Sequence, residues 1–368
     1  MIKIDRLLFV LSVLASLYGL LLIKSAVPAE NTEWYLYVQA TAIIIGIVSF
    51  FMLSLLDLTV VTACWRSFFF AGLLLICLLF PFGTGLESTG NNSWIRFNLM
   101  GLSAGFQPAE IAKLFYVISL SGHIAELGDT VSSPKSLFLL LLNGAIPPVA
   151  VVLASRDYGM ALSFIAIFMF SVFAAGIKLR YFAWLTAACA ALSPLIWNNL
   201  LLERHRERII SVFQPENDPL GTGFQVIRSK AAIAAGGFFG HGTLTDGVSY
   251  ASLPARHTDF IFAVACEEYG FIGGMAILAL LFFIILRLLL NAARAATRSG
   301  RIVCVGVASS LIFQTFASVG MCVGLSPVIG ITLPFFSYGG TSVVASFTML
   351  GLCSIYKKAA NINGSRLM

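Results

Sequence analysis

Long runs of apolar residues dominate this chain, and polar residues are confined to short segments between them. A helix that crosses a bilayer needs about 20 predominantly apolar residues. The runs do not alternate as barrel strands do, and backbone groups in lipid must be satisfied within the segment, so the runs predict helices. There are ten such segments, approximately 7–23, 35–56, 67–83, 107–122, 136–154, 158–176, 181–201, 260–287, 302–325 and 341–356. The pattern predicts an all-α polytopic membrane protein with about ten transmembrane helices in a single domain over 1–368.

The composition supports this prediction. Of the 368 residues, 58% are hydrophobic and only 11% are charged, whereas about 25% of the residues of an ordinary soluble domain are charged. A soluble fold of this size needs more ionisable side chains to cover its surface. We therefore exclude a soluble enzyme, a disordered protein and a nucleic-acid binder. Membrane lipids are the expected surroundings, and the net charge of +6 bears on topology and anionic head groups.

The basic residues predict the orientation of the chain. An even number of spans puts both ends on one side. With the N-terminus inside, the inner segments carry 13 Lys and Arg residues, and the short outer loops carry three, Lys24, Arg96 and Arg156. This bias predicts that both termini are cytoplasmic.

One long outer loop, 202–258, separates the seventh and eighth segments and is expected to be structured, because loops of that length are usually functional. Within it, 223–236 has the pattern of a short amphipathic helix. Two interpretations remain open for that helix. It lies in the membrane interface, or its Arg228 and Lys230 contact a lipid phosphate.

Two charged residues fall inside the fourth segment. Glu110 and Lys113 are three residues apart, on one face of the predicted helix. An ionisable group within a span costs at least about 2.5–3.5 kcal/mol on insertion scales, which makes each one a functional candidate. The spacing alone does not separate a functional site from an internal ion pair that only stabilises the bundle.

A second charged cluster precedes the eighth segment. Arg256, His257 and Asp259 end the long loop, so the Asp259 carboxylate is expected at the outer water boundary. From the residues alone, Thr258 or Asp259 as a helix cap is the favoured interpretation.

Two outer connections are unusual. Residues 155–159, with Arg156 and Asp157, form a very short charged hairpin, and residues 324–342 join the last two segments without a single charge. The glycines and prolines of the second connection forbid a continuous helix, and its apolar character favours a re-entrant loop packed against protein over a plain turn.

No GxxxxGK[ST], HExxH or paired-cysteine pattern occurs, and the four histidines are scattered. We therefore expect no nucleotide-binding machinery, no zinc site and no dedicated metal site.

Six strings in a fixed order resemble the SEDS family (shape, elongation, division and sporulation), which comprises RodA, FtsW and SpoVE proteins. The resemblance covers nearly the whole chain, and the compact ends look most like the RodA branch. The strings are QPAEIAKL at 107–114, RDYGMAL at 156–162, DPLGTGFQ at 218–225, GGFFGHG at 236–242, PARHTDFIFAVACEEYGFIGG at 254–274 and LPFFSYGGTS at 333–342. Departures occur at Ala255, where the family commonly has Glu, at His241, where it has Lys, and at Ser318, where it has Asn. A fourth departure is Asn92-Ser93 before Trp94, where basic residues are common. These departures put details of substrate contact in doubt.

The resemblance implies a peptidoglycan glycosyltransferase of the bacterial cytoplasmic membrane. Such an enzyme polymerises lipid II on the outer face, releases undecaprenyl pyrophosphate and acts with a class B penicillin-binding protein, in cell-wall elongation for the RodA branch. By the same resemblance, Asp259 matches an essential aspartate, and Glu110 and Lys113 match an ion pair of the fourth helix.

The expected chemistry assigns roles to the flagged residues. Asp259 is the candidate base for the acceptor hydroxyl, and cationic side chains hold the diphosphate. Lipid tails need a groove that opens sideways to the bilayer. The expected substrate-binding residues are Arg208 and Lys113 first, then Arg228, Lys230 and Arg256, together with Glu110, His257 and Asp157. No cofactor is expected apart from a divalent cation, Mg²⁺ or Mn²⁺, whose participation the sequence leaves open.

Two rival functions use the same features. A lipid II flippase would move the head group across the membrane with intramembrane charges, and a scaffold would only recruit the transpeptidase. The outstanding charges gather at the outer boundary, and no repeat relates the two halves, so the sequence favours chemistry over transport.

Overall fold

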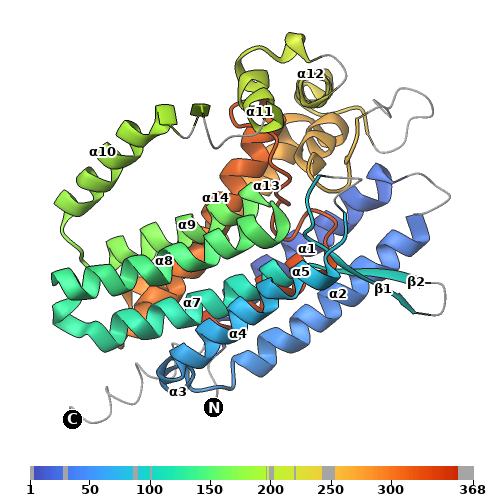
Figure 1. The fold of residues 1–368 in the computed structure, drawn as a ribbon. Helices are drawn as coiled ribbons and strands as arrows, with labels where there is room; N and C mark the ends of the chain where they lie inside the picture. Colours follow the sequence, from blue (N-terminus) through green and yellow to red (C-terminus); the bar gives the residue numbers. More distant parts are fainter. Residues whose placement is uncertain are drawn as a thin grey trace.

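The computed structural model describes residues 4–27, 32–85, 90–99, 102–195, 197–198, 203–218, 221–242 and 253–354. Helices make up the body of the molecule (Figure 1). One helix lies within or across each of the ten predicted segments: α1 (Arg6–Ala26), α2 (Thr32–Leu53), α4 (Trp65–Cys77), α7 (Pro108–Leu127), α8 (Pro134–Ser155), α9 (Tyr158–Ala174), α10 (Leu179–Leu195), α13 (Ile261–Ala293), α14 (Arg298–Val323) and α15 (Gly340–Ser354). The prediction of a helical polytopic membrane protein is confirmed.

Among the described residues, six stretches are long and apolar enough to cross a membrane: α1, α2, Trp65–Phe82, α8, α13 and α14. The helices α9 and α15 are apolar but shorter. Shorter elements connect the long ones: α3 (Leu58–Ala63), α5 (Leu79–Phe82), η2 (Gly128–Ser132), α11 (Glu203–Phe213), η4 (Pro215–Asn217) and α12 (Thr222–Gly236). The amphipathic helix predicted in the long loop is α12.

Helix ends follow from local chemistry. Asp5 caps α1 by accepting a hydrogen bond from the Leu8 backbone nitrogen at 3.3 Å. Prolines begin α7 and α8, where a missing N–H costs nothing. Helix α13 is interrupted at Gly270, with φ 65° and ψ −159°. A Cβ there would lie 2.5 Å from the backbone nitrogen of Gly240, so the loop after α12 can pack against α13 only because residue 270 is a glycine.

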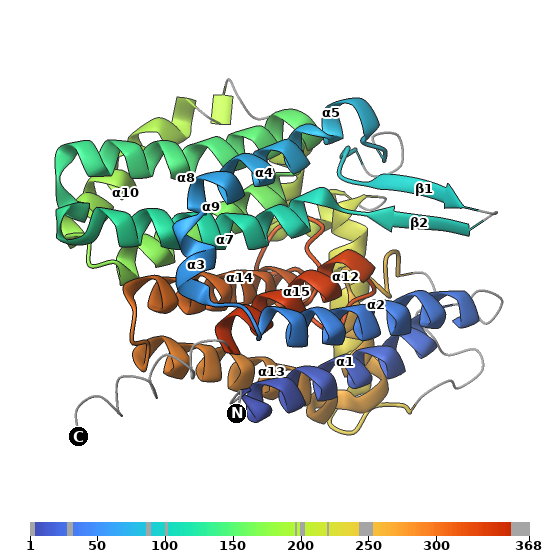
Figure 2. The same ribbon diagram turned by 90° about the horizontal axis from the view of Figure 1, so that it is seen from below.

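One element departs from the all-α prediction. Strands β1 (Ile95–Leu99) and β2 (Leu102–Phe106) pair antiparallel, with Ile95 opposite Phe106. Figure 2 shows this hairpin at the end of the bundle where α2 begins. The open edges of such a hairpin can be satisfied by water but not by lipid, so we expect it to lie outside the hydrocarbon region.

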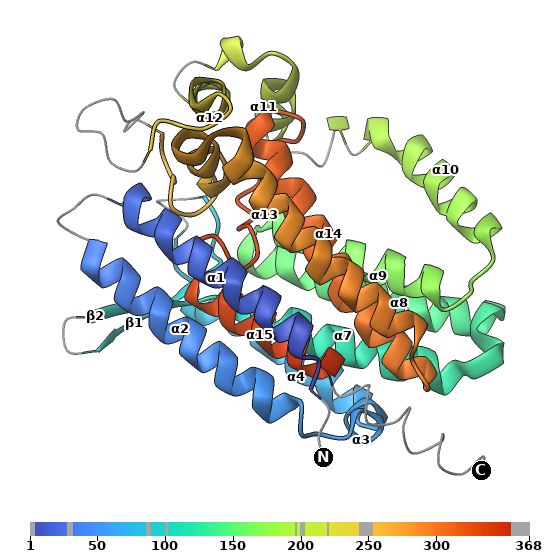
Figure 3. The ribbon, with the colours of Figure 1, turned by 180° about the vertical axis from the view of Figure 1, so that it is seen from behind.

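The described starts and ends of the chain lie at the opposite end of the bundle from α11 and α12 (Figure 3). The ring centroids of Phe9 in α1 and Phe50 in α2 are 5.3 Å apart, and Gly351 of α15 also packs against Phe50. The Arg6 end of α1 and the Ser354 end of α15 are therefore neighbours. The side of the membrane on which they lie stays a prediction.

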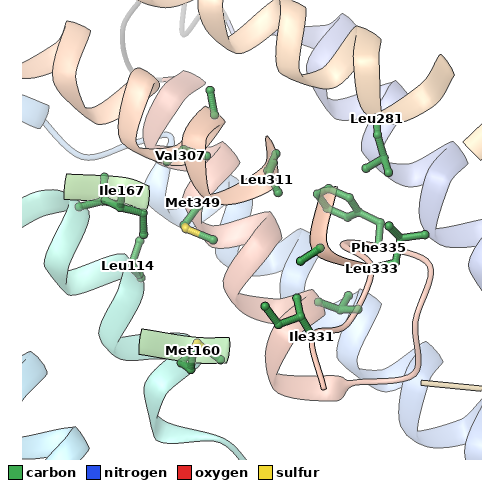
Figure 4. Packing of buried hydrophobic residues seen from close by; sticks show 14 of the residues in the cluster. Leu114, Met160, Ile167, Leu281, Val307, Leu311, Ile331, Leu333, Phe335 and Met349 are labelled. Carbon is green, nitrogen blue, oxygen red and sulfur yellow. The ribbon is translucent and has the colours of Figure 1, made fainter. Parts of the chain in front are cut away.

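The uncharged connection before α15 is part of the core. Its Ile331, Leu333 and Phe335 are 4%, 1% and 1% exposed. They belong to the same buried cluster as Leu311 of α14 and Met349 of α15 (Figure 4). The prediction of a loop packed against protein is confirmed, and this loop, residues 324–339, links the core to the site described next.

Candidate functional site

A cavity of about 660 Å³ lies at the end of the bundle that carries α11 and α12. Its lining combines ionisable and aromatic side chains from elements far apart in sequence. The ionisable ones are Glu110, Asp157, Arg208, His257 and Asp259, and the large aromatic ones are Trp34, Tyr35, Trp94 and Tyr338. Five sequence-predicted site residues therefore meet in one cavity.

Asp259 enters the cavity from a turn that precedes α13. The backbone nitrogens of Thr258, Asp259 and Phe260 all donate to the Ala255 carbonyl, at 3.2, 3.1 and 3.2 Å. The helix N-cap is Phe260, without a side-chain cap. The interpretation of Thr258 or Asp259 as a helix cap is therefore wrong, because the turn satisfies its own amides and the Asp259 carboxylate faces the cavity.

Burial raises the pKa of Asp259 from 3.8 to about 6. A hydrogen bond from Thr258 opposes the shift, the Asp157 carboxyl adds to it, and the Arg208 guanidinium opposes it. Gly330 of the 324–339 loop faces this carboxylate, since a Cβ there would lie 3.8 Å from Asp259 Oδ2. A carboxylate with a pKa near neutrality in a cavity is suited to accept a proton.

Asp157 is held rigidly on the other side of the cavity. It caps α9 by accepting from the Met160 backbone nitrogen at 2.9 Å, and its second oxygen accepts from the Ser93 hydroxyl at 2.9 Å. Arg156, just before it, has φ 56° and closes the short hairpin predicted at 155–159. Burial raises the pKa of Asp157, and its two hydrogen bonds only partly offset this.

The ion pair of α7 lies at the inner edge of the cavity. Lys113 Nζ is 2.8 Å from Glu110 Oε2, and the two side chains are 0% and 2% exposed. Glu110 lines the cavity, whereas Lys113 is absent from the lining. The structure therefore places Lys113 behind its carboxylate partner, away from the space that a diphosphate would fill.

Arg208 of α11 lies where the cavity meets an apolar groove. The groove has a volume of about 690 Å³ and is lined mainly by α8 and α9, from Leu141 to Met169. Arg208, Asn91 and Ile329 line both spaces. A charged head held by Arg208 would thus have an apolar surface beside it for a lipid tail.

The apolar surface continues towards the other end of α8 and α9. A second groove of about 310 Å³ shares Leu141, Phe168 and Met169 with the first and reaches Trp184 of α10. Helix α10 stands away from the rest of the bundle (Figure 1 and Figure 3). An apolar groove beside the cavity is therefore present, and its opening towards the bilayer stays a prediction.

Besides Lys113, three more predicted cationic ligands do not line the cavity. Arg256 lies 3.7 Å from Glu267, the Arg228 guanidinium lies over the Phe224 ring at 5.1 Å, and Lys230 packs beside Gly324 at the end of α14. A cation at a helix C-terminus is stabilised by the helix dipole, so Lys230 has a structural partner there. The prediction that these three side chains contact substrate has no support in the geometry.

The sequence did not point to the aromatic wall of the cavity. Trp34 and Tyr35 begin α2, Trp94 precedes β1, and Tyr338 precedes α15. Tryptophan and tyrosine are enriched at the ends of most transmembrane helices, so this signal does not single out those that line a site. Within the described residues, no group of three or more His, Cys, Asp or Glu side chains could hold a metal ion.

Comparison with known proteins gives a consistent picture. The family profile of FtsW, RodA and SpoVE, described as "Cell cycle protein", matches residues 5–361. The "Peptidoglycan glycosyltransferase MrdB" of Escherichia coli (strain K12) is 35% identical over 269 residues, which cover 73% of this chain and 71% of that protein. "Stage V sporulation protein E" of Bacillus subtilis (strain 168) is 30% identical over 362 residues, 95% of either chain.

Two solved structures share the fold. One is a chain of a peptidoglycan synthase complex solved for the coordination of polymerization and crosslinking, with a TM-score of 0.83 and 30% identity over 98% of this chain and 99% of that chain. The other is the rod shape determining protein RodA of Thermus thermophilus, with a TM-score of 0.70 and 27% identity over 97% of both chains.

Proposed function

The chain belongs to the FtsW, RodA and SpoVE family of cell cycle proteins, and from this premise we propose that it is a peptidoglycan glycosyltransferase that polymerises lipid II into glycan strands. The observation that carries the proposal is the meeting, at Arg208, of a cavity containing Asp259 and an apolar groove. A polymerase of lipid-linked sugars needs all three: a base, a cation for the diphosphate and a surface for the lipid.

The reaction joins two lipid-linked sugars. The Asp259 carboxylate accepts the proton of the acceptor C4 hydroxyl, and the hydroxyl oxygen forms a bond to C1 of the donor sugar. The bond between C1 and the diphosphate oxygen breaks, and undecaprenyl pyrophosphate leaves with the bonding electrons. Because the leaving group is already good, positioning, a base and charge neutralisation are sufficient.

In this proposal, Arg208 neutralises the charge of the leaving group. A guanidinium binds phosphate oxygens through paired, charge-assisted hydrogen bonds. Its position between cavity and groove fits a ligand with a sugar diphosphate at one end and an isoprenoid chain at the other. In the same proposal, Asp157, which is held by hydrogen bonds from Met160 and Ser93, accepts hydrogen bonds from sugar hydroxyls.

We propose a class B penicillin-binding protein as the partner. A structural neighbour comes from a peptidoglycan synthase complex that couples polymerization to crosslinking. The location that fits is the bacterial cytoplasmic membrane, with both termini cytoplasmic and the cavity on the outer face. Resemblance to the RodA branch favours a role in cell-wall elongation.

A divalent cation would enter with the diphosphate. Mg²⁺ and Mn²⁺ prefer hard oxygen ligands, which the diphosphate itself supplies, and among the described residues no group of three or more His, Cys, Asp or Glu side chains could hold such an ion. We therefore propose that the ion, where it takes part, is brought by the substrate.

One assay tests the function directly. The purified protein is incubated with lipid II in the absence of any other polymerase, and glycan strands are separated by electrophoresis. Glycan strands that form together with undecaprenyl pyrophosphate support the proposal. Transfer of lipid II across a vesicle membrane without polymer would instead support a flippase. Neither product, together with capture of the transpeptidase, would support a scaffold.

The rate of polymerisation should fall at acidic pH. The base acts as the carboxylate, and its pKa of about 6 means that the ionised fraction is nearly complete above pH 7 and drops tenfold per pH unit well below pH 6. We expect an acid limb in kcat/KM centred near pH 6. A profile that stays flat down to pH 4.5 would contradict this assignment of the base.

Arg208→Gln should raise the KM for lipid II by about tenfold or more, because a hydrogen bond to a charged group contributes about 1.5–3 kcal/mol. The acid limb should also move to higher pH, since Arg208 lowers the pKa of Asp259. The matched control is Arg206→Gln on the same helix, whose guanidinium donates to the Asn198 carbonyl at 2.9 Å. Equal effects of both substitutions would contradict a specific role for Arg208.

A further inference from the structure

A glutamine lies fully buried about two turns into an apolar span. Gln39 of α2 has 0% exposure. Its amide nitrogen donates to the Ser337 carbonyl at 3.1 Å, and its amide oxygen accepts from the Gly339 backbone nitrogen at 3.2 Å. The side chain thus satisfies one acceptor and one donor of the 324–339 loop. An apolar residue of the same size would fill the space but leave both groups unpaired.

The same loop segment holds the turn that carries Asp259. The Ser337 hydroxyl donates to the Thr258 carbonyl at 2.5 Å and accepts from the Leu333 backbone nitrogen at 2.8 Å. One residue later, the Tyr338 backbone nitrogen donates to the His257 carbonyl at 2.8 Å. Residues 337–339 are therefore bonded to Gln39 on one side and to the two residues before Asp259 on the other.

Helix α2 makes a second contact with the same turn. Tyr35 lies one helical turn before Gln39, and its ring is 4.7 Å from that of Tyr338 and 5.0 Å from that of His257. The turn needs such support, because its Ala255 has φ 52°, a conformation that residues with a side chain rarely adopt. Backbone of this kind persists only where the surroundings hold it.

We propose that Gln39 is a positioning residue for the reaction: through Ser337 and Tyr338 it fixes the turn that aims the Asp259 carboxylate at the acceptor hydroxyl. The inference rests on the proposed function, because it concerns the same carboxylate. Gln39 itself is absent from the cavity lining and acts only through the loop. Its role is the geometry of the base, not contact with substrate.

Gln39→Met tests this role, because methionine has a similar volume and no amide. We expect kcat to fall by roughly 10-fold to 100-fold, since small misplacements of a catalytic group can cost about 100-fold, with the KM for lipid II within about twofold of the unchanged protein. The acid limb of the pH profile should move below pH 6, because a loosened turn exposes the Asp259 carboxyl to water. The matched control is Thr41→Val, which removes a side-chain hydrogen bond on the exposed face of the same helix and should change neither parameter.

Ser337→Ala provides a second route, because it removes the direct bond to Thr258. It should reproduce the loss in kcat. The kcat of the double variant should lie within about twofold of that of the less active single variant, because both substitutions act through one connection. If Gln39→Met does not yield folded protein, the kcat and the pH profile of Ser337→Ala test the inference.

An unchanged kcat in both variants, or a fully additive double variant, would overturn the inference. So would a loss confined to thermal stability. Failure of the unsubstituted protein to polymerise lipid II would instead count against the proposed function.

Discussion

Asp259→Asn is expected to reduce kcat for polymerisation of lipid II by about 10²–10⁴-fold, the range that general base catalysis contributes. Asparagine has the same shape as aspartate but cannot accept the proton of the acceptor hydroxyl. The KM should change little, because Arg208 and the apolar groove hold the substrate lipid in both proteins. The measurement is steady-state glycan synthesis by the purified variant, with lipid II binding measured separately.

Glu216→Gln is the matched control for this substitution. Glu216 is an exposed carboxylate on η4, at the same end of the molecule, and does not line the cavity. It should retain full activity. If Asp259→Asn kept more than about a tenth of the activity, the loss would be smaller than general base catalysis contributes. Another group would then have to be the base. Asp157, the second cavity carboxylate with a raised pKa, would then be the candidate.

Much of the fold could be predicted because a long apolar segment in lipid forms a helix. The hydrocarbon core leaves the backbone of such a segment no partner outside itself, so all ten predicted segments coincide with helices. The interruption of α13 at Gly270 could not be predicted in this way. It depends on the approach of the loop after α12, which is a contact between residues 30 positions apart. The hairpin of β1 and β2 lies outside the spans, where this constraint does not apply.

The residues of the candidate site could likewise be predicted only in part. Asp259 and Glu110 could be predicted because an ionisable side chain beside apolar runs is costly and therefore conspicuous. Arg256 and Lys230 are also conspicuous charges, yet they contact Glu267 and the end of α14 instead of the cavity. Sequence spacing fixes which residues are near the membrane boundary but not the direction in which each side chain points.

Gln39 is a residue that the sequence did not point to. A single amide within an apolar span gives little signal, because its significance depends on the loop of residues 324–339, about 300 positions away. Buried hydrogen bonds between distant segments become visible only in the folded chain. The groups that carry the chemistry are thus easier to find from sequence than the groups that hold them in place.

Lys113→Met is expected to destabilise the folded protein by about 3–5 kcal/mol, because it leaves the Glu110 carboxylate buried without its cation. The pair is 2.8 Å apart and essentially inaccessible, so water cannot replace the lost partner. The expected readouts are a lower thermal unfolding temperature in detergent and loss of glycan synthesis. Lys135→Met, at a basic residue in the first turn of α8 that is exposed, is the matched control and should change neither.

The double variant Glu110→Gln/Lys113→Met separates the two interpretations of this pair. Replacing both charges by neutral groups of similar size removes the uncompensated buried charge, and such replacements are often neutral for stability. We expect the double variant to regain most of the lost stability and to bind lipid II with a KM within a few fold of the unchanged protein, because Lys113 lies behind Glu110 and outside the cavity lining. A stable double variant with a KM raised about tenfold or more, the loss expected for a charged hydrogen bond, would show instead that Lys113 contacts the diphosphate, and the pair would then belong to the binding site rather than to its frame.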